Sequence, residues 1–147
     1  MISWGIGILS TYSNKGVFAN DPEKWDDVSG VSLKLPKRSD SQGFALVTLN
    51  VPAFTAFGLW SNRSVDYPGG QLGISIDDKM HETIAEFSSG FRSVHSAGAT
   101  SATLIVGIEL KADAEQQVKA VVRRIHPQSS VHAPGASLSA IIGARRT

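Results

Sequence analysis

Histidine, serine and carboxylate side chains are the groups in this chain that could carry out catalysis, and histidine also binds metals. The chain has four histidines and no cysteine. His81-Glu82 begins like the zinc-protease helix motif, but Ala85 stands where the second histidine belongs. The absence of cysteine excludes disulfides, thiolate metal sites and cysteine nucleophiles. We therefore expect no metal site and no cofactor.

The sequence also gives little support for catalysis by serine or carboxylate side chains. Ser88-Ser89-Gly90 lacks the flanking glycines of a nucleophile elbow. Asp26-Asp27 and Asp77-Asp78 offer the paired carboxylates that glycoside hydrolysis requires, yet adjacent acids in turns are more often caps and solvated turn residues. Asn62-Arg63-Ser64 matches a glycosylation acceptor, which we interpret as a chance match. We predict that the protein is not an enzyme.

The remaining candidates are polar and aromatic side chains in predicted loops. They are Trp60, Tyr67, Arg92, His95, Arg124 and His126. Hydroxyl-rich ligands are held by hydrogen bonds from Arg or Asp and by an aromatic face packed on their C–H surface. Each residue alone also has an ordinary interpretation, as loop packing for the aromatic residues and as exposed surface for the others. As a set, they favour a binding protein.

The composition is typical of one folded, β-rich domain covering residues 1–147. Apolar residues make up 41% and charged residues 18%, which does not suit a disordered chain. At this length a chain buries roughly two thirds of its unfolded surface. The net charge is +1, and the dense basic pairs are confined to residues 37–38, 123–124 and 145–146. We expect no nucleic-acid partner.

The N-terminal residues show no targeting segment. Residues 1–12 have no basic leader, and their apolar run is too short for a secretory signal. No window approaches the roughly 18 apolar residues of a membrane span. We expect a soluble protein without membrane insertion, cytoplasmic by default or exported by a route that needs no N-terminal signal.

The elements that would position the candidates are organised around residues 101–110. Every second residue of this segment from Leu104 on is apolar, which predicts a strand with one fully apolar face. A second strand over 118–125 would complete a hairpin near the middle of a sheet. A helix over 114–125 with Asp113 as its cap fits the same residues, and the pattern leaves both interpretations open.

Turn signals divide the rest of the chain into short strands and loops. The predicted strands are 2–10, 28–35, 44–51, 72–76 and 136–143, and residues 80–87 fit either a strand or a helix. Pro52 is expected to end the strand before it. The predicted loops are 88–100 and 126–134, and residues 53–70 fit either a long loop or two short edge strands. Eight or so short strands without α/β alternation favour an antiparallel sandwich or jelly roll.

Several predicted strands are apolar on both faces. They include 44–51, the segment with Val121 and Ile125, and the pair Ile141-Ile142. A two-layer monomer of this size would leave part of that apolar surface in water. We expect a closed homo-oligomer that buries it.

Five framework stretches carry a resemblance to a known family. They are 25–33 (WDDVSGVSL), 46–52 (LVTLNVP), 67–69 (YPG), 103–106 (TLIV) and 136–141 (ASLSAI), of which NVP and SLSAI are the most specific. In order and nearly in spacing, they resemble the TNF-like (tumour-necrosis-factor-like) fucose-binding lectin domain family, found at the N-terminus of a Burkholderia superlectin. The resemblance implies an all-β, antiparallel TNF-like jelly-roll β-sandwich that assembles as a trimer. It implies glycan sites at clefts between protomers, and a strand rather than a helix after Asp113.

The sugar contacts of that family carry over in part. Its Thr-Tyr pair falls at Ser88-Ser89, its Ser-Thr-x-Arg loop at 96–99, its Tyr at Thr55 and its strand Arg at His126. Ser96 alone is unchanged, and Arg92, His95 and Arg124 lie close enough in sequence to supply replacement donors. The carbohydrate-binding residues expected on this basis are Ser88, Ser89, Arg92, His95, Ser96, Arg124 and His126, with a glycan as ligand and fucose as the sugar of the family.

Two functions from different classes follow from these expectations. The first is a non-enzymatic, homotrimeric lectin with shallow sites between protomers, at residues 88–96 and at the end of strand 118–125. Three shallow sites would provide avidity even where each is weak. The second is a trimeric TNF-like interaction or structural module that binds no sugar. It would engage a protein through the aromatic segment from Phe54 to Tyr67.

Overall fold

The computed structural model describes residues 3–13, 24–38, 42–58, 69–88, 97–125 and 129–146. Within these ranges the protein is all β, with nine strands and no helix. The strands are β1 (Ser3–Ser13), β2 (Asp26–Leu35), β3 (Gln42–Gly58), β4 (Gly69–Ile76), β5 (Lys79–Ser88), β6 (Ala97–Glu109), β7 (Gln116–Arg124), β8 (Ser129–His132) and β9 (Ala136–Arg146). It follows that no described helix is long and apolar enough to cross a membrane.

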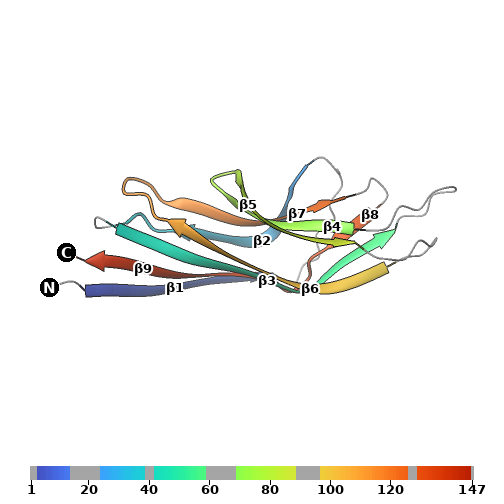
Figure 1. Ribbon diagram of the computed structural model, residues 1–147, viewed down its shortest axis with the longest axis horizontal. Coiled ribbons are helices and arrows are strands. Elements are labelled where there is room, and N and C mark those ends of the chain that lie inside the picture. Colours follow the sequence, from blue (N-terminus) through green and yellow to red (C-terminus); the bar gives the residue numbers. More distant parts are fainter. Residues whose placement is uncertain are drawn as a thin grey trace.

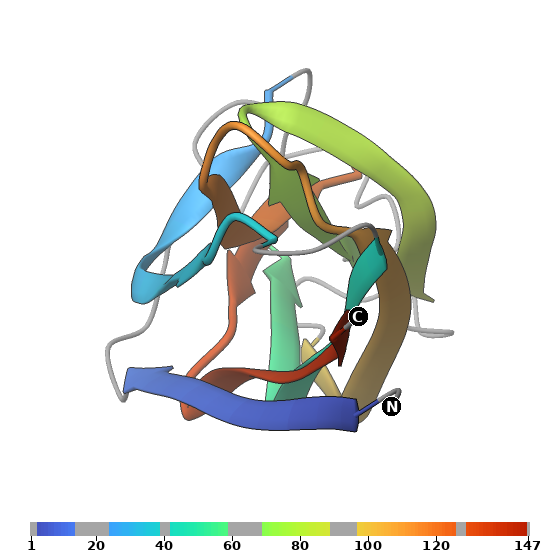
Figure 2. The same cartoon turned by 90° about the vertical axis from the view of Figure 1, so that its left-hand side faces the viewer.

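The strands form two antiparallel sheets that stack as a β-sandwich (Figure 1). The β3 sheet has the order β1-β9-β3-β6, with β8 paired to the last residues of β3. The β4 sheet has the order β2-β7-β4-β5. In the end-on view of Figure 2, β1 runs along the bottom in blue and β5 lies at the top in green, one from each layer. The predicted antiparallel all-β fold is therefore confirmed.

A single apolar core lies between the two sheets because the strand sequences alternate. Val118, Ala120 and Val122 of β7 are fully buried, while Gln117 before Val118 and Lys119 after it face outward. In a strand, successive side chains point to opposite faces, so every second residue reaches the core. Four such residues of β3, from Ala45 to Val51, are fully buried in the same cluster. Burying one Val or Leu side chain stabilises the fold by about 1.5–3 kcal/mol.

The predicted hairpin of residues 101–110 and 118–125 is wrong, although both segments are strands. Among the described strands, β6 pairs with β3, whereas β7 pairs with β2 and β4 in the other sheet. Leu104, Val106, Ile108 and Leu110 of the β6 segment bury against the core from one side, and the apolar face of β7 buries from the other. The chain after Leu110 therefore crosses between layers. The helix alternative over 114–125 is wrong for the same reason, since an extended β7 fills the centre of its sheet.

Strand β3 also differs from the prediction, because it continues through Pro52 to Gly58. Its register with β6 shifts between Val51 and Phe54, which marks a β-bulge. Proline has no N–H to donate to a ladder, and a bulge is where a strand tolerates that loss. Beyond the bulge Phe54 points into the core and is 1% exposed. The predicted strand end at Pro52 is therefore wrong, and so is the expectation that Phe54 forms part of a contact surface.

Three more segments are strands. The sequence pattern was ambiguous for one of them and predicted a loop for the other two. Residues 80–87 belong to β5, so the helix alternative is excluded there. Strand β8 lies inside the predicted loop 126–134, and β6 begins at Ala97, inside the predicted loop 88–100. Both short stretches pair with the unpredicted end of β3, which supplies their hydrogen-bond partners.

Val121 is not part of a surface that needs a partner, contrary to the prediction. It lies on the outer side of β7 but is only 2% exposed. Its cross-strand neighbour is Gly73, and a Cβ at Gly73 would lie 2.7 Å from Met80 Cε and 3.3 Å from the Trp25 ring. The side chains of Trp25 and Met80 therefore cover this part of the outer face within one chain.

Candidate functional site

The described part of the predicted sugar site lies at the end of the sandwich where β4 begins. This end is opposite to the one where β1 begins and β9 ends (Figure 1). Ser88, the last residue of β5, pairs with Gly69, and Arg124, the last residue of β7, pairs with Gly70. The antiparallel register thus brings Ser88 and Arg124 to the two sides of β4.

The other predicted site residues are Ser89, Arg92, His95, Ser96 and His126, and they lie outside the described residues, as do Asn62, Trp60 and Tyr67. Thr55, at the position of the family's Tyr, pairs with His132 of β8, and its hydroxyl donates to the Ala53 carbonyl at 3.2 Å. Burial lowers the pKa of His132 below its ordinary value of 6.5, so a neutral imidazole is favoured beside Thr55.

The core beneath this end is tightly packed across the two sheets. A Cβ added to Gly70 would lie 2.6 Å from Val131 Cγ2 and 3.1 Å from Phe54 Cζ. Phe54 of β3 and Phe87 of β5 meet edge to face, with ring centroids 6.4 Å apart and planes at 64°. These contacts make a firm apolar base under Arg124. The base was missed at the sequence level because Phe54 falls in the irregular segment 53–70.

Arg124 is the most unusual side chain of this end. It follows Val118, Ala120 and Val122 at two-residue spacing, so it leaves β7 on the side that faces the core. Its Nε is buried and has no hydrogen-bond partner among the residues that the structure describes. A buried donor without a partner is costly. Arg124 is therefore the residue of this end whose hydrogen bonding the described chain leaves incomplete.

Its neighbour Arg123 has the opposite environment. The guanidinium lies 4.9 Å from the Trp25 ring centroid on the outer side of the β4 sheet. Its Nε donates to Gln71 Oε1 at 3.0 Å, and its Nη2 donates to the same oxygen. Gln71 Nε2 in turn donates to Glu86 Oε2 at 2.7 Å. The Trp25 ring and the hydrogen-bonded chain of Gln71 and Glu86 thus hold Arg123 on the outer face, which indicates a structural role.

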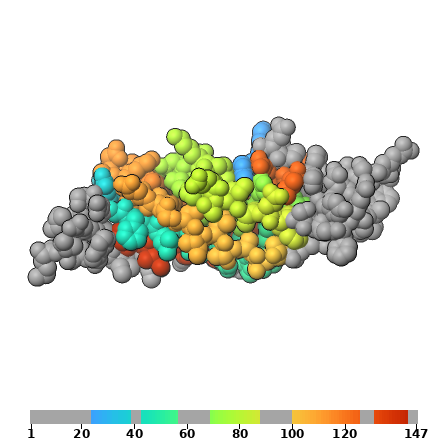
Figure 3. All heavy atoms as spheres, in the orientation of Figure 1, coloured from blue at the N-terminus to red at the C-terminus, as the bar shows by residue number. Residues whose placement is uncertain are grey.

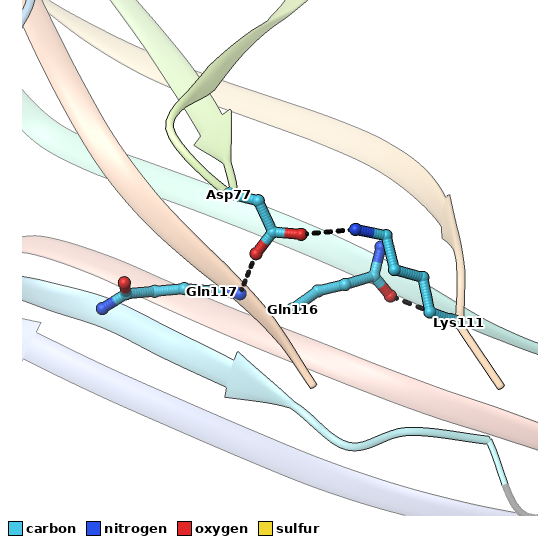
Figure 4. A network of polar contacts seen from close by, with 4 residues as sticks. All are labelled: Asp77, Lys111, Gln116 and Gln117. Atoms are coloured by element: carbon cyan, nitrogen blue, oxygen red, sulfur yellow. Dashed lines mark hydrogen bonds and ion pairs between the residues drawn. The ribbon is translucent and has the colours of Figure 1, made fainter. Parts of the chain in front are cut away.

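The acidic pair Asp77-Asp78 forms the turn between β4 and β5, and Figure 4 shows the polar contacts of Asp77. Both residues have positive φ, 49° and 62°, a conformation that Asp tolerates better than most residues. Asp77 Oδ2 accepts from Lys111 Nζ at 2.8 Å, and Oδ1 accepts from the Gln117 backbone N–H at 2.9 Å. The Lys111 hydrogen bond, with the Gln117 one, holds the pKa of Asp77 below 3.8. These bonds fit the ordinary turn role.

No arrangement suited to a metal is present in the described ranges. There, no three or more His, Asp or Glu side chains gather in a way that could hold an ion. The zinc-like start His81-Glu82 lies on β5, where His81 Nδ1 accepts the Thr83 backbone N–H at 3.1 Å.

Comparison with known proteins adds little to this description. No protein-family model matches the sequence, and no curated protein matches it. Among solved structures, the chain is similar to dimeric latent PorU from Porphyromonas gingivalis, with a TM-score of 0.42 and 9% identity. The match covers 96% of this chain and 13% of that one, so this chain spans a small part of its length. A likeness this distant carries no argument about function.

Proposed function

We propose that this protein is a non-enzymatic lectin, a TNF-like jelly-roll homotrimer that binds a glycan at clefts between protomers. Fucose is the first sugar to test, because the sequence resembles a fucose-binding family. The cleft would be formed by residues 88–96 and by the end of β7. The observation that carries the proposal is the inward-facing Arg124 with its buried, unpartnered Nε.

The strand order supports the jelly-roll part of the proposal. From β2 to β4, and again from β5 to β8, each strand is followed by one in the other sheet. Repeated crossing between two antiparallel sheets is what distinguishes a jelly roll from a sandwich of simple meanders. The outer strands β1 and β2 belong to different sheets, which fits the same arrangement.

The outer face of the β3 sheet supports the trimer. Phe44, Leu46, Ile105 and Ile141 are between 41% and 58% exposed there. Leu46 of β3 pairs with Ile141 of β9, and Ile105 of β6 pairs with Thr48, two residues further along β3. The apolar side chains of three neighbouring strands therefore lie close together in one patch. Atoms of β3 (turquoise) and β9 (red) reach the surface together in Figure 3. A patch of this kind is usually buried by another protein surface.

Arg124 supports a ligand with hydroxyl groups. A guanidinium offers five N–H donors and keeps its charge, so an uncompensated one at a protein surface recognises oxygen acceptors. Ser88 lies on the other side of β4 at the same end. The edge-to-face contact of Phe54 and Phe87 packs the base under Arg124, and a pre-organised base lowers the entropy lost when a ligand binds.

A glycan array probed with the labelled, intact oligomer tests the proposal without presupposing the site. We expect a reproducible signal that free sugar competes away. A blank array from a protein confirmed as an oligomer would contradict the lectin proposal. The interaction module without sugar binding would then be the better explanation of the exposed patch.

The site assignment predicts different results for two adjacent arginines. Arg124→Ala should weaken binding of the array's best glycan by roughly tenfold or more, because a charged hydrogen bond is lost. Arg123→Ala is the matched control, because Arg123 is engaged by Trp25 and Gln71 on the outer side. Isothermal titration of both variants measures the difference. Equal affinities for the wild type and Arg124→Ala would remove Arg124 from the site.

A further inference from the structure

Strand β2 opens away from β7 in a wide bulge. Asp27 pairs with Val121, and the next paired residue of β2 is Ser32, opposite Lys119. The stretch 28–31 of β2 therefore faces the single residue Ala120 of β7. Gly30 has a φ of 78°, the left-handed conformation that favours glycine, and so lets the chain turn within the bulge. Bulges of this kind often lie beside binding sites, because they redirect side chains.

The bulge creates a groove on the surface of one protomer. Its volume is about 450 Å³, and it is lined by Asp27, Ser29, Gly30, Ser32, Gln117 and Lys119, over a base of Val28 and Val31. Val28 and Val31 are 2% and 1% exposed, so they anchor the bulge in the core. The polar lining thus stands on a fixed base, and neither Ser88 nor Arg124 is among the residues that line the groove.

Two ion pairs orient the charged side of the groove. Lys119 Nζ lies 3.3 Å from Asp27 Oδ2 and 2.9 Å from Asp78 Oδ1. The Asp78 and Asp27 hydrogen bonds raise the pKa of Lys119 above 10.5, so its charge is maintained. An ammonium has three N–H donors, and these contacts use two of them. Lys119 therefore retains a donor, and the Asp27 carboxylate retains acceptor positions.

Three uncharged polar side chains add unused hydrogen-bonding capacity. No side-chain hydrogen bond joins Ser29, Ser32 or Gln117 to the rest of the described chain. In Figure 4 the Gln117 side chain points away from Asp77, and Gln117 contacts that carboxylate through its backbone N–H alone. An amide and two hydroxyls beside an Asp–Lys pair present alternating donors and acceptors. That pattern matches neighbouring hydroxyls of a neutral sugar better than it matches an ion.

We propose that this β2–β7 groove is a second carbohydrate subsite, which binds one neutral saccharide unit within a single protomer. Asp27 and Gln117 would bind adjacent hydroxyls, and Ser32 and Lys119 would donate to ring or glycosidic oxygens. This inference rests on the proposed lectin function but uses different residues. A glycan that reached both sites of one trimer would gain avidity.

Chemical-shift mapping of the ¹⁵N-labelled protein tests the groove directly, with methyl fucoside, methyl mannoside and methyl galactoside as probes. We expect amides of residues 27–32 and 117–119 to shift with at least one probe, at millimolar affinity. The double variant Ser32→Ala/Gln117→Ala should weaken that affinity by roughly tenfold. Ser101→Ala is the matched control, because Ser101 is an exposed serine on β6 in the other sheet.

The outcomes separate this inference from the lectin proposal. Shifts in the groove that survive Arg124→Ala and disappear in the double variant support the subsite. Shifts confined to residues near Ser88 and Arg124 overturn the subsite and leave the lectin proposal standing. Shifts at neither place, with all three glycosides, overturn the subsite, and with a blank glycan array they overturn the lectin proposal as well.

Discussion

At the scale of single residues, environment rather than residue type decides function. Arg123 and Arg124 are identical and adjacent, yet one is held by Trp25 and Gln71 while the other has a buried Nε without a partner in the described chain. The alternation of a strand produces this difference, because neighbouring side chains leave on opposite faces. One of the two is therefore structural and the other a candidate ligand contact.

Asp77 allows a prediction about acid stability. Its pKa is lower in the folded protein than the ordinary 3.8, so its contribution to the free energy of unfolding is present above 3.8. That contribution is lost as the pH falls through the lower folded value. Asp77→Asn keeps a residue that tolerates positive φ but removes the charge. We expect the variant to be less stable at neutral pH and to converge with the wild type in acid.

Urea unfolding of wild type and Asp77→Asn across this pH range measures the effect. The control is Asp113→Asn, an exposed carboxylate near Lys111 that forms no hydrogen bond with it in the described structure. A stability difference for Asp77→Asn that stays constant from neutral to acid pH would show that the Lys111 and Gln117 bonds do not set it.

At the scale of elements, the close approach of β4 to β8 determines how the site end is built. Gly70 has Val131 γ carbons at 2.6 and 2.8 Å from the position of a Cβ, whereas Gly107 of β6 has nothing within 4 Å. Both glycines lie in strands, and neither has a positive φ. Their different surroundings are therefore a matter of tertiary packing alone.

This pair of glycines predicts opposite effects of the same substitution. Gly70→Ala should destabilise the protein by about 1–3 kcal/mol, because the β-branched Val131 and the ring of Phe54 have little room to move. Gly107→Ala should be neutral or stabilising by about 0.5 kcal/mol, since alanine restricts the unfolded chain more than glycine does. Urea unfolding of both variants provides the comparison. Similar losses at both positions would contradict the close packing at Gly70.

At the scale of the whole molecule, the β3 sheet carries more of the large apolar side chains that stay exposed in the described chain than the β4 sheet does, where Met80 and Ile84 are exposed. Phe44, Leu46, Ile105 and Ile141 share the outer face of the β3 sheet. The outer face of the β4 sheet differs, because Trp25 and Met80 cover its centre from within the chain. The two sheets are thus unequal, and the β3 sheet is the better candidate for contacts between protomers.

A charged substitution on the outer face of each sheet tests whether the β3 sheet forms the contact between protomers. Ile105 is 58% exposed on the β3 sheet and Ile84 is 43% exposed on the β4 sheet. Ile105→Glu should lower the mass in light scattering from trimer to monomer, because a buried charge without a partner is costly at an interface. Ile84→Glu should leave the trimer intact. A monomeric wild type, or a trimer that survives Ile105→Glu, would contradict the proposed interface.

Local sequence determined the all-β class of this fold and the position of most of its strands. Alternating apolar residues in 101–110 and 28–35 predicted β6 and much of β2, because period two is a property of each strand by itself. Alternation also placed Arg124 on the same side as Val118, Ala120 and Val122. In β2 the buried residues Val28 and Val31 are three positions apart, with Ser29 and Gly30 between them, and this break in the two-residue spacing marks the bulge. The regular alternation of the later residues made the break easy to overlook.

Tertiary structure alone decided which strands pair and which surfaces stay exposed. The hairpin of 101–110 with 118–125 satisfied the local pattern, but burial of both apolar faces requires the two strands to lie in opposite sheets. Pro52 looked like a strand end, and only the pairing of β3 with β6 accommodates it in a bulge. The sequence pattern predicted that Val121 would be exposed, but the side chains of Trp25 and Met80 cover its cross-strand neighbour Gly73. In each case the deciding partner is distant in sequence, so no local pattern contains it.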